Sequence, residues 1–267
     1  MPFEYEKKGD VAYFTIRNGS VNPMTPSMHK QLYELLHDFQ ADQDIRVGIM
    51  TGAGDRAFSA GDDIRNSYAV FDSKREELMA HMTPRHRVQQ GDPDTFAWSR
   101  DVLTMERYKP IIGAVKGYCL GQGLIYLLML TDIRIASEDA TFGFPEIAYG
   151  MGGAGGSTRV GRQIPHTAAM WMLLTGDPMN AQDALRYDLV NKVVAKDQVM
   201  AEAEAAAAKI ARHPPLAIRV EMEAYYRGMD SDKLGALNYT KQLYRMQRLG
   251  IGTEKVEEAF LYKRKED

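Results

Sequence analysis

Two glycine-containing turns in this chain could bind an oxygen that becomes negatively charged during a reaction. The first is Ala60-Gly61-Asp62, which follows the apolar run 47–52, and the second is Gly121-Gln122-Gly123, which follows the apolar run 111–115. The second turn leads into residues 124–130, an apolar stretch that begins a predicted helix. Glycine lets the backbone approach a ligand closely, and the first N–H groups of a helix have no partner within it. Backbone N–H groups from two such turns could together stabilise an oxyanion.

One carboxylate, Glu146, is the candidate for moving a proton. It follows Phe142, Phe144 and Pro145, and apolar neighbours of this kind disfavour the charged form and raise the pKa of a carboxyl group. A raised pKa suits a group that both takes and gives a proton near neutral pH. Two plainer interpretations stay open. Glu146 could bind backbone N–H groups at a helix start, and each glycine turn could bind no ligand.

Composition limits the class of protein. The chain has 267 residues, of which 45% are hydrophobic, and a formal net charge of −3. This length suits one large domain or a domain with an appendage, and the charge gives no reason to expect nucleic acid or a membrane surface as a partner. Cys119 is the single cysteine, so no intrachain disulfide is possible. Because the N-terminus is polar and no apolar run could span a bilayer, we expect a cytoplasmic protein.

Strand and helix patterns alternate along the first part of the chain. Residues 11–16 and 45–51 are typical of strands, as are the runs near Ile111 and Ile133. Thr25 is followed by a proline and predicts the N-cap of a helix between the first two strands. This alternation predicts an α/β fold.

The two glycine turns, the run Phe144-Pro145-Glu146 and the run Gly152-Gly153-Ala154-Gly155-Gly156, taken in this order, resemble the crotonase family of enoyl-CoA hydratases and isomerases. The resemblance implies an α/β, crotonase-like spiral of repeated ββα units over residues 1–213 and a C-terminal helical trimerisation region over residues 214–267. It implies a homotrimer or a dimer of trimers that acts on an acyl-CoA thioester. It also implies no metal and no separate cofactor, since coenzyme A arrives as part of the substrate.

The same resemblance assigns functions to individual residues. The N–H groups of an oxyanion hole would come from Asp62 and from the turn Gln122-Gly123, where Gln122 replaces a glycine that is usual in the family. A backbone donor tolerates that change, although the glutamine side chain could crowd the hole or reach the acyl group. Coenzyme A would contact residues of the first turn and of the last helix, namely Ala60, Gly61, Ile64, Phe260 and Lys263.

One departure from the family pattern concerns the proton-moving groups. Family hydratases carry two glutamates that face the substrate, and Glu146 matches only the second. Counting forward from Gly121-Gln122-Gly123 places the first at Ile125, whereas counting back from Asp132 places it at Tyr126. Neither residue is a carboxylate, so we expect Glu146 to be the single acid/base and ordinary hydration to be weak. Tyr126 could supply a catalytic hydroxyl hydrogen bond or could be a buried helix tyrosine.

Three functions are compatible with these residues. The leading one is an enzyme of the enoyl-CoA hydratase/isomerase type, in which an oxyanion hole stabilises a thioester enolate and Glu146 moves the proton. The second is a hydrolase or C–C bond lyase that acts on a specialised CoA thioester, and the third is a non-catalytic CoA-binding homologue. Region 66–107, which is longer than the family pattern and holds two expected helices, could wall an unusual acyl pocket or be a solvated surface excursion.

Overall fold

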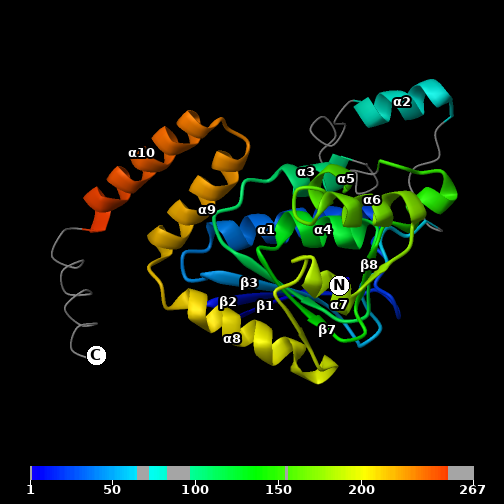
Figure 1. Ribbon diagram of the computed structural model, residues 1–267, viewed down its shortest axis with the longest axis horizontal. Coiled ribbons are helices and arrows are strands. Elements are labelled where there is room, and N and C mark those ends of the chain that lie inside the picture. Colours follow the sequence, from blue (N-terminus) through cyan, green and yellow to red (C-terminus); the bar gives the residue numbers. More distant parts are fainter. Residues whose placement is uncertain (1, 65–71, 83–96, 154–155, 252–267) are drawn as a thin grey trace.

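The computed structural model describes residues 2–64, 72–82, 97–153 and 156–251 (Figure 1). Its larger sheet has six strands, in which the first pair is antiparallel and the others are parallel. This sheet and the helices around it confirm the α/β fold. In spatial order the strands are β1 (Phe3–Lys8), β2 (Val11–Ile16), β3 (Val47–Gly52), β5 (Ile111–Val115), β7 (Ile133–Ser137) and β10 (Lys192–Val194).

A second, smaller sheet lies beside the first and carries the glycine turns. Three times in succession the chain passes from a strand of the six-stranded sheet to a short strand of the smaller one, and after the second pair it enters helix α4 (Gln122–Leu130). This is the repeated ββα spiral. Strands of three residues are too short for a clear sequence pattern. The smaller sheet consists, in order, of β4 (Ala57–Ser59), β6 (Tyr118–Leu120), β8 (Thr141–Gly143) and β9 (Met179–Asn180).

Helices cover both faces of the larger sheet. Helices α1 (Pro26–Ala41) and α4 lie on one face, and α8 (Val199–Ala211) lies on the other (Figure 1). Helix α8 buries Val199, Ala203 and Ala207, which recur every four residues and therefore share one side of the helix. These small residues let α8 approach the β-branched side chains of β3, β5 and β7 closely. Helix α4, which carries the second glycine turn, packs on β4 and β6, and its Leu127 lies against Gly113 of β5.

The remaining helices include two in region 66–107, as expected, namely α2 (Lys74–Met82) and α3 (Ala97–Thr104). Asn180 caps the helix that begins at Ala181, since its side chain accepts a hydrogen bond of 2.8 Å from the N–H of Asp183. In α6 (His166–Thr175), Met172 is buried but Trp171 beside it is 65% exposed, so only one side of α6 faces the core. The other short helices of the core region are η2 (Pro145–Tyr149), α5 (Ser157–Val160), α7 (Ala181–Arg186) and η3 (Lys196–Gln198).

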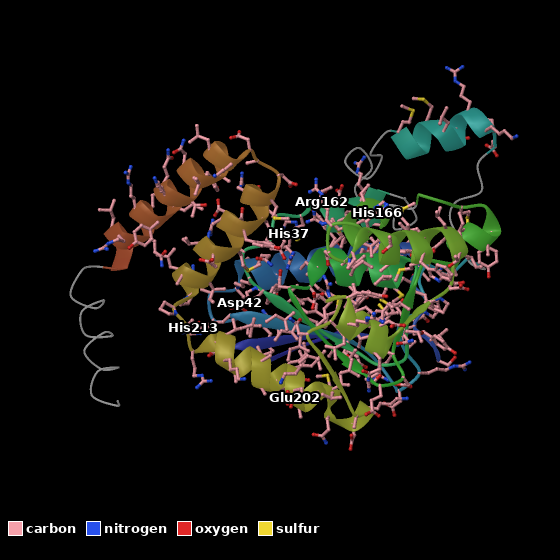
Figure 2. The ribbon with its side chains drawn as sticks, in the orientation of Figure 1. His37, Asp42, Arg162, His166, Glu202 and His213 are labelled. Carbon is pink, nitrogen blue, oxygen red and sulfur yellow. The ribbon has the colours of Figure 1, made fainter. Side chains whose placement is uncertain are left out.

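The C-terminal part of the described chain is a helical hairpin of α9 (Pro215–Met229) and α10 (Lys233–Ile251). Figure 2 shows His213 at the turn where the chain leaves α8 for this hairpin. The hairpin is attached to the core by Tyr226, whose hydroxyl contacts both Arg107 and Asp132. No residue of α9 is fully buried. Among the described residues, no helix is both long and apolar enough to cross a lipid bilayer.

Candidate active site

The two glycine turns meet in space, because β4 and β6 are neighbouring parallel strands whose carboxyl ends reach the same edge of the smaller sheet. Gly61 has φ +96°, and a β-carbon on it would lie 3.1 Å from Leu120 O and 3.3 Å from Gln122 N. Gly121 has φ +53°. Side chains of L-residues rarely accept such backbone conformations, so both positions require glycine. The expected candidates Ala60, Gly61 and Asp62 therefore lie directly against the start of α4.

A buried asparagine holds the first turn in place. Asn22 is fully buried, and its side chain donates to the carbonyl of Ala57 at 2.9 Å. Its own carbonyl accepts from Ser59 Oγ at 2.8 Å, and Ser59 Oγ accepts in turn from the N–H of Gly61 at 3.1 Å. Buried polar groups that are all hydrogen-bonded fix a single geometry. The network thus sets the position from which Asp62 presents its backbone N–H.

The second turn presents the N-terminus of α4. Gly121 is the N-cap residue, and its N–H donates to the carbonyl of Gly143 on the neighbouring strand at 2.9 Å. The N–H groups of Gln122 and Gly123 belong to the first helical turn, where no intrahelical acceptor exists and the helix dipole favours negative charge. The Gln122 side chain is half-buried, and its Nε2 has no hydrogen-bond partner among the described residues.

Glu146 brings its carboxylate to this point. It lies on the single-turn helix η2, and a β-carbon placed on Gly121 would collide with Glu146 Oε1. The other oxygen, Oε2, is buried and has no hydrogen-bond partner among the described residues. Burial raises the pKa of this carboxyl group above its usual value, its own backbone N–H opposes that shift, and the negative charge of Asp62 adds to it. The glutamate therefore has the environment that the sequence predicted.

The structure separates Ile125 and Tyr126, the two residues at which the missing glutamate was sought. A β-carbon on Gly156 would lie 2.9 Å from Ile125 Cγ1 and would meet the ring of Phe144, so Ile125 belongs to the apolar surroundings of η2. Tyr126 turns toward α1 instead, where its hydroxyl lies 2.6 Å from His29 Nδ1. His29 Nε2 in turn lies 3.2 Å from Asp62 Oδ1.

His29 is the site residue that sequence reasoning missed. No histidine lies near Asp62 in the sequence, and His29 reaches it only because α1 packs beside the first glycine turn. Its spacing from Met28 and Leu32 on the buried side of α1 was the available signal. A polar residue on an apolar helix face needs a partner when it is buried. Here Tyr126 is the hydrogen-bond partner of His29, and Asp62 Oδ1 is a polar contact of its other ring nitrogen.

The expected coenzyme A contacts fall partly within the described chain. Ala60 is half-buried and Ile64 is 63% exposed, next to the turn that contains Gly61. Phe260 and Lys263 lie outside the described residues. A small cavity of about 30 Å³ lies beside Glu146 and is lined by Phe144, Ile147, Met151, Gly152, Gly153, Gly156 and Leu173. In the described ranges, no group of three or more His, Cys, Asp or Glu residues is arranged to hold a metal ion.

The fold and this site define a crotonase-type α/β protein. The sequence profile of the family described as Enoyl-CoA hydratase/isomerase matches residues 6–267, so the chain belongs to this family and is an enzyme of it. The (E)-benzylidenesuccinyl-CoA hydratase of Thauera aromatica is 34% identical over 93% of this chain and 91% of its own length. The short-chain-enoyl-CoA hydratase of Clostridium acetobutylicum is 32% identical over 90% of this chain and 86% of its own.

Solved structures agree with this assignment. A crystal structure of enoyl-CoA hydratase from Bacillus anthracis matches with a TM-score of 0.82 at 27% identity, over 99% of this chain and 97% of that one. A second structure of enoyl-CoA hydratase, from Mycobacterium smegmatis, matches with a TM-score of 0.84 at 25% identity, over 98% and 97% of the two chains. The crotonase-like fold is thereby confirmed along nearly the whole chain.

Proposed function

We propose that this enzyme adds water across the double bond of a 2-enoyl-CoA thioester, with Glu146 moving the proton at the α-carbon. The observation that carries the proposal is the position of the Glu146 carboxylate, which lies against the N-cap of α4 with a raised pKa. A protonated carboxyl group at this point can protonate the α-carbon, and its carboxylate can remove the same proton in the reverse direction. The names of the two relatives as hydratases support this direction of chemistry.

The thioester oxygen would accept hydrogen bonds from the N–H groups of Asp62 and Gln122. When water attacks the β-carbon, the electrons of the double bond move toward the thioester carbonyl and leave an enolate. Fixed backbone donors stabilise that charge without reorganisation, which is the largest electrostatic contribution available to this chemistry. Glu146 then gives its proton to the α-carbon, and the carbonyl forms again. The attacking water loses one proton to solvent, and solvent returns one proton to Glu146, so the sum is one enoyl thioester plus one water to one 3-hydroxyacyl thioester.

A deuterium experiment tests the role of Glu146. Wild-type protein and Glu146→Gln are incubated with crotonyl-CoA and with a 3-enoyl-CoA in deuterated water, and the products are followed by mass spectrometry. Loss of the proton-moving group should lower kcat by about 10²- to 10⁴-fold. Glu138→Gln is the matched control, because Glu138 is an exposed glutamate between β7 and β8. Near-normal turnover by Glu146→Gln would refute the assignment.

Double-bond isomerisation is the second candidate function. Neither Ile125 nor Tyr126, the two positions to which the counts assign the first glutamate of family hydratases, is a carboxylate, so α4 supplies no carboxylate to hold a water molecule. A lone carboxylate can carry a proton between two carbons of one acyl chain. Deuterium incorporation with a shifted double bond and no added water would favour this function. Release of free CoA would favour hydrolysis instead, and binding without any turnover would favour a non-catalytic homologue.

We also propose that the C-terminal hairpin packs on other copies of this chain. Helices α9 and α10 leave large apolar side chains exposed in the isolated chain, which is unusual for a surface that faces only water. Family resemblance points to a trimer or a pair of trimers. Light scattering coupled to size-exclusion chromatography would measure the mass, and a monomer would refute the proposal. The exposed residues include Leu216, Tyr225, Met229, Leu237, Tyr244 and Leu249.

A further inference from the structure

Three polar side chains from separate elements form a path that ends in the active site. The Tyr126 hydroxyl of α4 lies 2.6 Å from His29 Nδ1 of α1, and His29 Nε2 lies 3.2 Å from Asp62 Oδ1 in the first glycine turn. Tyr126 and His29 are 0% and 1% exposed. The last contact is polar but lacks the alignment of a full hydrogen bond. Hydrogen bonds of this kind in ligand-free sites often tighten when a substrate binds.

This path serves more than packing. Burying a hydroxyl group and an imidazole costs free energy that an apolar pair of similar size would not. Asp62 is the member of this path that solvent can reach, because 28% of its side chain is exposed while its Oδ1 is buried against His29. In the tautomer that donates from Nε2, His29 can accept from the Tyr126 hydroxyl at Nδ1. Tyr126 then fixes the His29 ring, and the His29 ring lies against the Asp62 carboxylate.

The turn that carries Asp62 lies beside the Glu146 carboxylate. A β-carbon on Gly121 would collide with Glu146 Oε1 and would lie 3.7 Å from Gly61 Cα, so the turn that carries Asp62 and the Glu146 carboxylate flank one residue. The negative charge of Asp62 is close enough to raise the pKa of Glu146. Like charges at a shared site favour one ionised and one protonated carboxyl group. Such a pair can remove one proton and donate another.

We propose that Asp62 is the second acid/base residue of this site and holds the attacking water, and that His29 and Tyr126 position its carboxylate. The inference rests on the proposed hydration of an enoyl thioester and adds to it the residue that activates the water. It replaces the expectation, made from the missing helix glutamate, that Glu146 works as a single acid/base. The same residue would then supply a backbone N–H to the thioester oxygen and a side-chain carboxylate to the water.

The proton and electron movements balance with these groups alone. The ionised Asp62 carboxylate takes one proton from water as the water oxygen bonds to the β-carbon. The π electrons become the enolate, whose oxygen is held by the backbone donors. Protonated Glu146 gives its proton to the α-carbon. One proton has moved onto Asp62 and one has left Glu146, so exchange through solvent restores the starting state, and the net consumption is one water.

The test compares hydration with isomerisation in the same variants. Asp62→Asn keeps the size and the backbone N–H but removes the base, so the ratio of hydration rate to isomerisation rate should fall about 10²-fold. Glu146→Gln should lower both rates. Asp44→Asn, at an exposed aspartate beyond the end of α1, is the matched control. An unchanged ratio of the two rates in Asp62→Asn overturns the inference. This holds when both rates stay at the wild-type level, and also when both fall equally, because an equal fall would mean that only the turn is damaged.

A second variant keeps the inference falsifiable if Asp62→Asn folds poorly. Asp62→Glu retains a carboxylate, so its ratio of hydration to isomerisation should exceed that of Asp62→Asn. Tyr126→Phe removes one buried hydrogen bond and should lower kcat for hydration by about tenfold with little change in KM. In the Asp62→Asn background the same change should have no further effect on hydration. An equal loss in both backgrounds would mean that Tyr126 acts independently of Asp62, which overturns its positioning role.

The two levels of proposal fail differently. If wild-type protein hydrates crotonyl-CoA and Asp62→Asn does so equally well, the role of Asp62 is wrong and the proposed function stands. If wild-type protein isomerises the 3-enoyl-CoA without hydrating either thioester, the hydratase function is wrong, and the water-holding role of Asp62 is wrong with it.

Discussion

Substituting Gly121 by alanine tests the central geometry of the site, because one added methyl group would enter the space of the Glu146 carboxylate. The perturbation has two parts. The first is backbone strain, since Gly121 has φ +53° and alanine rarely adopts such a conformation. The second is a collision with Glu146 Oε1, which has to move away. A matched control separates them. Gly54 has φ +74°, but a β-carbon there would meet nothing within 4 Å.

The expected magnitudes differ for stability and for activity. Positive-φ strain at a non-glycine residue costs about 1–3 kcal/mol, so both Gly121→Ala and Gly54→Ala should lower the free energy of unfolding by amounts in this range. For a chain of this size each kcal/mol corresponds to a fall in Tm of roughly 2–4 °C. A displacement of about 1 Å in a catalytic group can cost 10²-fold in rate. Only Gly121→Ala should show that loss.

The assay measures kcat for crotonyl-CoA turnover beside Tm for wild-type protein and both variants. We expect Gly54→Ala to keep the wild-type kcat while its Tm falls. We expect Gly121→Ala to lose about 10²-fold in kcat at a comparable fall in Tm. If Gly121→Ala turns over at the wild-type rate, the Glu146 carboxylate does not act from its place against the N-cap of α4, and the proposed function loses its main support.

Two further predictions concern charge and attachment. Because burial raises the pKa of Glu146, its carboxyl group stabilises the folded state fully only below the unfolded pKa, and that contribution is lost as pH rises through the folded pKa. Glu146→Gln should therefore match wild type in Tm at about pH 4 and exceed it at about pH 8, and a difference that stays constant with pH would contradict the raised pKa. Tyr226→Phe removes the hydroxyl that contacts Arg107 and Asp132, so it should lower the free energy of unfolding by about 2 kcal/mol. It should also speed tryptic cleavage near His213, between α8 and α9. Tyr225→Phe, at an exposed neighbour, is its control, and equal cleavage rates in the two variants would refute the role of Tyr226.

Local chemistry explains what the sequence predicted well. The glycine turns were visible because only glycine accepts the backbone that Gly61 and Gly121 adopt. The raised pKa of Glu146 followed from its aromatic neighbours along the chain, since Phe144 is only two residues away and remains beside it in the fold. The start of α1 after its N-cap residue Thr25 was equally local. Each of these features depends on a few consecutive residues, so no tertiary information was needed.

Features that depend on tertiary packing could not be predicted in the same way. His29 and Tyr126 lie 97 residues apart, and Asp62 lies on a third element, so no spacing in the sequence brings them together. The short strands of the smaller sheet were missed because three residues carry no readable alternation of apolar and polar side chains. The exposure of Trp171 likewise depends on which side of α6 faces the rest of the chain.

The disagreement over Ile125 and Tyr126 has a physical origin with consequences for the reaction. Successive residues of a helix point about 100° apart, so one extra residue between the glycine turn and Asp132 turns the two counts to different sides of α4. Ile125 faces the apolar surroundings of Phe144, and Tyr126 faces His29. A carboxylate at either position would lose what that side now provides, either an apolar side chain beside Phe144 and Gly156 or a hydroxyl that contacts His29. The second acid/base group that we propose comes from a different element, since Asp62 is the residue that the path from Tyr126 reaches.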